Sequence, residues 1–130
     1  MEDLPVILVV EDDPQIQSVV EDALADAGFE PAIAPSGEEA VTLLKGMKHK
    51  YRALVTDVVL RGTMDGWEVA KHAREIDPAF PVVYVTAASA DRWPIEGVPN
   101  SVLLSNPFAP AQLVTAVSQL LNTGTSTPPS

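Results

Sequence analysis

Short apolar runs alternate along the chain with segments in which apolar residues recur at helical spacing. Five of these runs have the length of a β-strand, and three of the five are almost wholly apolar, which is typical of strands covered on both faces. Strands that alternate with helices predict βαβ units around a parallel sheet. The predicted strands are Val6–Val10, Pro31–Ala34, Ala53–Thr56, Val82–Thr86 and Val102–Leu104.

Four of the intervening segments predict amphipathic helices. The first has Asp13 as a candidate N-cap, Pro14 at its first position and Gly28 after its end. The second begins with the capping-box pair Ser36 and Glu39. The expected helices cover residues 14–27, 37–46 and about 66–76, and the last begins at residue 110.

Two segments lack a regular pattern. Residues 87–100 contain two prolines and a glycine, which leave room for only a short or distorted helix. Residues 122–130 are rich in Ser, Thr and Pro without apolar anchors, which predicts a disordered tail. We therefore expect one domain over residues 1–121, a disordered C-terminal tail over 122–130 and no second domain.

Composition excludes several classes of protein. No apolar run approaches the roughly 20 residues that a membrane-spanning helix needs. The formal net charge of −10 and the scattered Lys and Arg residues argue against nucleic acid as a partner. The chain has no cysteine, which rules out disulfides and thiol chemistry, and its N-terminus lacks the pattern of a secretory signal. We expect a cytoplasmic protein.

Polar side chains follow the predicted strands where each one ends. Glu11, Asp12 and Asp13 follow the first strand, and Asp57 follows the third. Ligands of open α/β sheets bind at this edge, and neighbouring carboxylates repel each other unless a cation lies between them. Their hard oxygen atoms suit Mg²⁺. The fourth and fifth strands are followed by Thr86–Ala87 and Ser105–Asn106.

A simpler interpretation covers the first acidic group alone. Asp13 would cap a helix, while Glu11 and Asp12 would be solvated loop residues, and for this group in isolation we favour that interpretation. Asp57 changes the balance, because it adds a carboxylate at the end of another buried strand. A carboxylate beside a metal can act as a nucleophile toward phosphorus and form an acyl phosphate.

Five motifs together resemble the receiver domain of two-component response regulators. They are ILVVEDDP, ALVTDVVL, MDGWEVA, VVYVTAAS and NPF, in this order, and the resemblance covers about residues 5–121. It implies a doubly wound (βα)₅ flavodoxin-like α/β fold, with a five-stranded parallel sheet of order 2-1-3-4-5 and helices on both faces. It also implies a phosphoacceptor that assists its own phosphorylation, not a conventional turnover enzyme.

The resemblance assigns roles to individual residues. Asp57 matches the phosphoacceptor, and Mg²⁺ would be held by Glu11, Asp12, Asp57 and the backbone carbonyl of Val59. Asp12 would be a direct ligand and Glu11 would act through water. On the phosphoryl side, the roles fall to Thr86, whose hydroxyl would bond the phosphoryl group, to Ala87, which leaves space for it, and to Asn106.

The resemblance also implies partners. A histidine kinase or a histidine phosphotransfer protein would supply the phosphoryl group. A downstream protein would bind the face formed by the fourth helix, fifth strand and fifth helix, and the same face would serve a homodimer. With no output domain in the sequence, we expect a single-domain response regulator that acts as a diffusible relay or a phosphate sink.

The chain departs from the family at Asn106, where the family has a lysine before Pro-Phe. An amide donates hydrogen bonds but carries no charge. Two interpretations stay open: a phosphorylated domain with altered switching, which we favour, or a pseudo-receiver that only binds a partner. Family likeness further predicts a cis peptide bond between Asn106 and Pro107.

Other departures concern switching and hydrolysis. Leu103 stands where many relatives carry a switching aromatic residue, and Val59 and Ala88 are apolar where relatives tune hydrolysis of the phosphoryl bond. We therefore expect a long-lived phosphorylated form. The loop between Asp57 and Gly66 is one residue longer than the family's usual spacing.

The remaining alternative is a phosphatase of the haloacid dehalogenase type. That family has a second Asp two residues after its nucleophile, where this chain has Val59.

Overall fold

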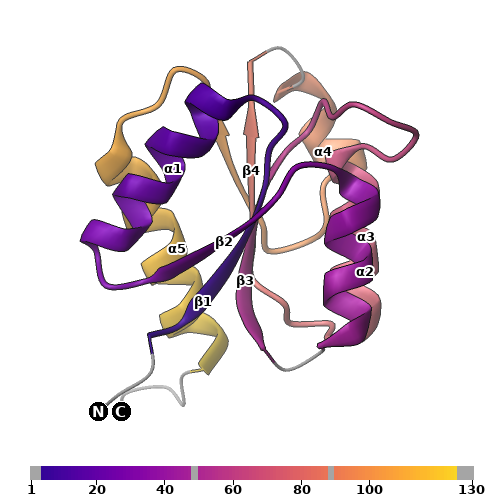
Figure 1. Cartoon of the computed structure of the whole chain (residues 1–130). Coiled ribbons are helices and arrows are strands. Elements are labelled where there is room, and N and C mark those ends of the chain that lie inside the picture. Colours follow the sequence, from indigo (N-terminus) through magenta and orange to yellow (C-terminus); the bar gives the residue numbers. More distant parts are fainter. Residues whose placement is uncertain (1–3, 48–49, 88–89, 126–130) are drawn as a thin grey trace.

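The computed structural model describes residues 4–47, 50–87 and 90–125 of the 130-residue chain (Figure 1). Within these residues, strands and helices alternate along the chain. The strands are β1 (Val6–Val10), β2 (Glu30–Ala34), β3 (Tyr51–Asp57), β4 (Val82–Thr86) and β5 (Val102–Ser105). The helices are α1 (Pro14–Asp26), α2 (Gly37–Gly46), α3 (Gly66–Ile76), the 3₁₀ helix η1 (Ala90–Arg92), α4 (Trp93–Glu96) and α5 (Pro110–Thr125).

The strands form one parallel sheet in the order β2-β1-β3-β4-β5. This confirms the predicted doubly wound (βα)₅ fold and its strand order. The chain leaves β1 toward β2 on one side and returns as β3 on the other side of β1. The loops after β1 and β3 therefore diverge at the carboxyl edge of the sheet, which is where open α/β sheets bind ligands.

Helices cover both faces of the sheet. Helices α1 and α5 lie together on one face, and α2, α3 and α4 lie on the other (Figure 1). Alternate residues of β1 point into the two cores: Ile7 and Val9 pack under α1 and α5, whereas Leu8 and Val10 pack under α2 and α3. All four side chains are buried, as the continuous apolar run predicted.

Side-chain caps fix the starts of three helices. Asp13 accepts a hydrogen bond from the backbone N–H of Gln15 at 2.9 Å, and Ser36 accepts one from that of Glu39 at 3.2 Å. Both caps confirm the sequence prediction. Asp65 caps α3 in the same way. Each such cap satisfies a backbone donor that the helix itself leaves unpaired, and it contributes about 1 kcal/mol.

Two element boundaries differ from the prediction by two residues or more, and several others differ by one residue. Strand β3 begins at Tyr51, two residues early, because Arg52 is exposed while Tyr51 is buried, so the apolar run looked shorter than the strand. Helix α5 continues to Thr125 and covers the first four residues of the segment predicted as a tail. Extending a formed helix costs little, since each added residue gains a hydrogen bond. Residues 126–130 lie outside the described residues.

The segment before β5 is short and irregular, as its prolines and glycine predicted. It contains the 3₁₀ helix η1 over Ala90–Arg92 and then the four-residue helix α4. Tyr84 holds it to the sheet, because its hydroxyl accepts a hydrogen bond from the backbone N–H of Val98 at 3.1 Å. Trp93 donates to the hydroxyl of Ser101 at 2.9 Å. No helix within the described ranges is both long and apolar enough to cross a membrane.

Gly66 allows the first turn of α3 to pack directly against the end of β3. A Cβ atom at this position would overlap the backbone carbonyl oxygen of Asp57 and would lie 2.9 Å from Cα of Val58. The backbone N–H of Gly66 also donates to the carbonyl of Val58 at 2.9 Å. The start of α3 thus packs on the backbone that carries Asp57.

Gly66→Ala should destabilise the fold by at least about 2 kcal/mol, because the added methyl group has no space and backbone atoms must move. Denaturant unfolding followed by circular dichroism measures the change. Gly46→Ala is the matched control, since nothing lies within 4 Å of a Cβ there. Equal stability of the two variants would show that the close approach at Gly66 is unimportant.

Candidate functional site

Three carboxylates meet at the carboxyl edge of the sheet. Glu11 and Asp12 directly follow β1, and Asp57 is the last residue of the adjacent strand β3. The strands are in register at Val10 and Thr56, so the residues that follow these two emerge side by side. Each carboxylate offers an oxygen atom, and these atoms all lie within 4.8 Å of one another. The structure therefore brings together the three acidic residues that the sequence placed at one edge.

Glu11 is the buried member of this acidic cluster, with 3% of its surface exposed. Its carboxylate accepts a hydrogen bond from the backbone N–H of Asp13 at 3.1 Å, and its backbone carbonyl accepts one from the side chain of Gln17 at 2.7 Å. These bonds hold the carboxylate toward Asp57 and Asp12. The capping segment of α1 therefore also orients a residue of the site.

Burial and like charge perturb the acidity of the pair formed by Glu11 and Asp57. Loss of hydration, followed by the negative charge of Asp57, raises the pKa of Glu11 to about 8. The pKa of Asp57 is also raised, chiefly by burial, although the backbone N–H of Val59 opposes the shift. Two close carboxylates cannot both ionise cheaply, so the metal-free pair holds a proton at neutral pH.

Asp57 is held at the strand end by its neighbours. The backbone N–H of Val59 donates to its Oδ1 at 3.3 Å, and the hydroxyl of Thr56 donates to its backbone carbonyl at 2.9 Å. The sheet itself continues one step further, because the N–H of Val58 donates to the carbonyl of Val85 at 3.2 Å. These contacts orient the carboxylate into the cluster.

Asp12 has a cationic neighbour that sequence reasoning missed. The backbone N–H of Arg61 donates to Asp12 Oδ2 at 2.8 Å, and Nε of the same arginine lies 3.7 Å from that oxygen. The side chain of Asp12 is 18% exposed and that of Arg61 is 86% exposed. The only sequence signal was a single cation four residues after Asp57, which does not by itself indicate a contact with Asp12.

The loop that carries Arg61 is anchored to α2. The carboxylate of Glu38 accepts hydrogen bonds from the backbone N–H and the hydroxyl of Thr63, at 2.9 and 2.8 Å. These bonds lower the pKa of Glu38. Gly62 has a positive φ of 98°, and a Cβ there would lie 2.9 Å from Glu38 Oε2. The loop therefore has a defined attachment, which the sequence did not reveal.

The other predicted site residues lie at the same edge of the sheet, at the ends of β4 and β5. Thr86 ends β4 and is 1% exposed, and its carbonyl accepts a hydrogen bond from the backbone N–H of Asn106 at 2.8 Å. Ala87 follows it and is exposed. The peptide bond between Asn106 and Pro107 is cis, which confirms that prediction.

Two further predicted positions have different outcomes. Val59 lies beside Asp57 with its side chain 65% exposed, but the contact that the structure gives is its N–H and not its carbonyl. A role for that carbonyl as a metal ligand stays a prediction. Ala88 lies outside the described residues.

The chemistry of the cluster fits a hard divalent cation. Mg²⁺ prefers a few carboxylate oxygens and keeps several of its waters, and Glu11, Asp12 and Asp57 provide such oxygens within one small site. The protonated pair described above is what such a site becomes without a cation, because two ionised carboxylates need a positive charge between them.

Comparisons with known proteins agree with this geometry. Residues 7–118 match the family described as the response regulator receiver domain. A crystal structure of a response regulator receiver protein from Sinorhizobium medicae is 42% identical, covers 94% of this chain and 98% of its own, and superposes with a TM-score of 0.91. The chemotaxis protein CheY4 of Vibrio cholerae is 26% identical over 91% of this chain and 99% of its own, with a TM-score of 0.79.

Among curated proteins, the response regulator receiver protein CpdR of Brucella abortus is 32% identical over 117 residues, which span 88% of this chain and 95% of CpdR. Several other relatives are longer. The chain spans about half of the transcriptional regulatory protein PhoP of Bacillus subtilis, for example, to which it is 31% identical over 88% of its own length. With the receiver pattern over most of its residues and the acidic cluster at the matching strand ends, the chain belongs to the response regulator receiver domain family.

Proposed function

We propose that this domain accepts a phosphoryl group on Asp57 from a phosphohistidine of a histidine kinase or histidine phosphotransfer protein in the cytoplasm. The observation that carries the proposal is the position of Asp57, which ends a buried strand within a cluster of three carboxylates. The near-complete coverage of CpdR supports action as a single-domain response regulator.

The reaction is a transfer between two nucleophiles. A carboxylate oxygen of Asp57 forms a bond to phosphorus while the bond from phosphorus to the histidine nitrogen breaks, and that nitrogen keeps the electron pair. Mg²⁺, bound through Glu11, Asp12, Asp57 and the carbonyl of Val59, would neutralise charge on the phosphoryl oxygens. The N–H of Val59 orients Asp57 for attack.

Three residues are assigned to the phosphoryl group itself. The hydroxyl of Thr86 would donate a hydrogen bond to a phosphoryl oxygen, and the small side chain of Ala87 leaves space beside it. The amide of Asn106 would donate a second bond. Support comes from the adjacent ends of β4 and β5, which are paired at Thr86 and Ser105 and are joined by the bond from Asn106 to Thr86.

The signal would leave through the face formed by α4, β5 and α5. Helix α4 is only four residues long, and it presents Ile95, whose side chain is 85% exposed. Leu103 of β5 is half-buried against the core that contains Tyr84. A downstream protein, or a second copy of the chain in a homodimer, would bind this face when phosphorylation repacks it.

A second function is favoured by Asn106 alone. Because an amide supplies no positive charge, the domain would act as a pseudo-receiver that binds its partner without phosphorylation. The intact carboxylate cluster favours the phosphoacceptor function over this alternative.

Incubation with acetyl phosphate and Mg²⁺ should add one phosphoryl group to the protein, and intact-mass spectrometry should detect it. Asp57→Asn should abolish the addition, because the amide is not nucleophilic. Asp77→Asn, which changes an exposed acid after α3, is the matched control and should be modified like the wild type. An unmodified wild-type protein would favour the pseudo-receiver instead.

The phosphorylated form should persist for minutes or longer in isolated protein, since the apolar side chain of Val59 cannot orient an attacking water. Val59→Asn should shorten its lifetime by about tenfold, because positioned hydrogen-bonding groups accelerate water attack by at least that much. Time-resolved mass spectrometry after removal of acetyl phosphate measures the decay. A wild-type lifetime of seconds contradicts the expectation.

Metal-free protein should lose stability as the pH rises. With the pKa of Glu11 raised from 4.5 to about 8, the folded state binds more protons than the unfolded state between these values, so the free energy of unfolding falls with increasing pH. We expect the thermal midpoint to fall by several degrees from about pH 5 to about pH 8, and Mg²⁺ to reverse the loss. Glu11→Gln should flatten the profile, and parallel profiles would contradict this.

A further inference from the structure

Phosphorylation of Asp57 would leave the acidic cluster short of positive charge. The phosphoryl group carries nearly two negative charges in place of the single charge of an ionised Asp57, and the carboxyl groups of Glu11 and Asp12 stay beside it. A protein cation within reach of Asp57 would therefore stabilise the modified state, and the amide of Asn106 cannot supply that charge.

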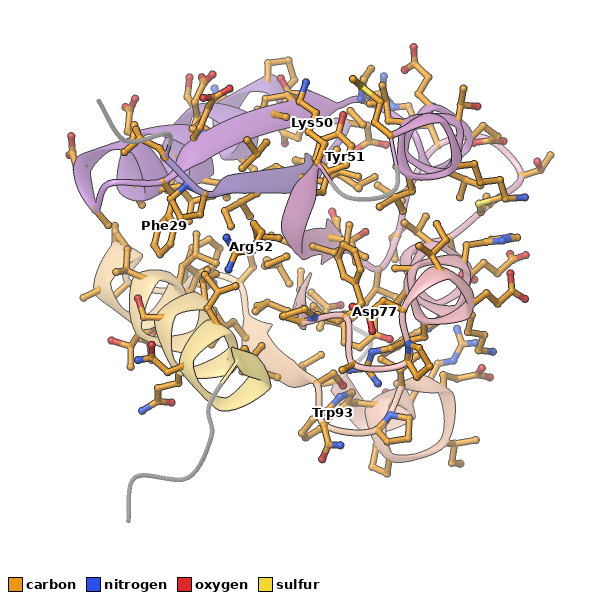
Figure 2. The ribbon with its side chains drawn as sticks, turned by 90° about the horizontal axis from the view of Figure 1, so that it is seen from below. Phe29, Lys50, Tyr51, Arg52, Asp77 and Trp93 are labelled. Carbon is orange, nitrogen blue, oxygen red and sulfur yellow. The ribbon has the colours of Figure 1, made fainter. Side chains whose placement is uncertain are left out.

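The other cationic side chains among the described residues either bind different groups or lie on other elements of the fold. The guanidinium group of Arg74 donates to the carbonyls of Phe80 and Pro99, and Lys71 and Arg92 both pair with Glu96. Seen from below in Figure 2, Lys50 and Arg52 lie at the start of β3, the opposite end of the strand from Asp57. Lys45 lies in the last turn of α2.

Arg61 is the described cation that contacts the acidic cluster. Its Nε lies 3.7 Å from Asp12 Oδ2, and its backbone N–H donates to the same oxygen at 2.8 Å. The backbone bond fixes the start of the side chain at the rim of the cluster. The side chain itself is 86% exposed, so it loses little packing when it changes partner.

We propose that Arg61 binds the phosphoryl group on Asp57, with its guanidinium moving from Asp12 onto the phosphoryl oxygens. This inference rests on the proposed function of Asp57. A guanidinium group suits the task, because it stays charged and its planar set of donors can bond two phosphoryl oxygens at once. The charge missing at Asn106 would thus come from the loop after β3.

The loop is built to keep Arg61 in place. Thr63 is tied to Glu38 at the start of α2 by two hydrogen bonds, and Gly62 packs closely against the same carboxylate. The loop is therefore attached twice, to Asp12 through the backbone N–H of Arg61 and to Glu38 through Thr63 two residues later. The backbone is held at both ends, while the guanidinium group is free to turn toward Asp57.

Beryllofluoride, which mimics a phosphoryl group on aspartate, is the probe for this proposal. Calorimetric titration in saturating Mg²⁺ should show about tenfold weaker binding to Arg61→Gln than to the wild type, the size expected for one charge-assisted hydrogen bond. Arg61→Lys should lie between them. Arg52→Gln removes the same charge at the far end of β3 and should bind like the wild type.

A cation on the other side of the site should compensate, so adding Asn106→Lys to Arg61→Gln should recover most of the lost affinity. Mg²⁺ alone should bind Arg61→Gln at least as tightly as the wild type.

Equal beryllofluoride affinity of Arg61→Gln and the wild type would overturn the role of Arg61 while leaving Asp57 as the phosphoacceptor. So would an equal loss of Mg²⁺ and beryllofluoride binding, because Arg61 would then only support Asp12. A wild-type protein that accepts neither beryllofluoride nor acetyl phosphate would refute the proposed function as well.

Discussion

Mutual repulsion among Glu11, Asp12 and Asp57 is the constraint on which the site depends. Their oxygen atoms lie within 4.8 Å of one another, and Glu11 is almost fully buried. Burial and then the charge of Asp57 raise the pKa of Glu11 to about 8, so without a cation the cluster retains a proton and its negative charge is reduced. A site that needs positive charge in its resting state is well suited to bind a metal and, next to it, a phosphoryl group.

Strand pairing and packing of the core hold these carboxylates close together despite their repulsion. Parallel pairing of β1 and β3 places their carboxyl ends at one edge, and the apolar side chains of both strands are buried between two helical layers. Gly66 lets α3 pack against the backbone of Asp57. Burial of the apolar side chains of β1 and β3 stabilises the fold. It therefore offsets the repulsion among the three carboxylates at the ends of these strands.

Most of the fold and the acidic cluster could be predicted from the sequence, because they depend on local patterns. Apolar runs marked the strands, Asp13 and Ser36 marked two helix starts, and the polar residues after each strand marked the site edge. The pairing of Arg61 with Asp12 and of Glu38 with Thr63 could not, because both depend on the path of a loop that no periodicity describes. The continuation of α5 over residues 122–125 was missed because Asn, Thr and Gly residues carry little helical signal.

Tyr84 and Thr86 point to the same face of β4, since side chains two residues apart on a strand share a face. The ring of Tyr84 lies 4.7 Å from that of Trp67, the residue after Gly66, and its hydroxyl holds Val98 near α4. This aromatic pair thus links the start of α3, which packs on the backbone of Asp57, to the segment that carries α4. A displacement of the Tyr84 ring would change the surroundings of the buried Trp67 indole, so ultraviolet emission from Trp67, next to that of Trp93, would report it.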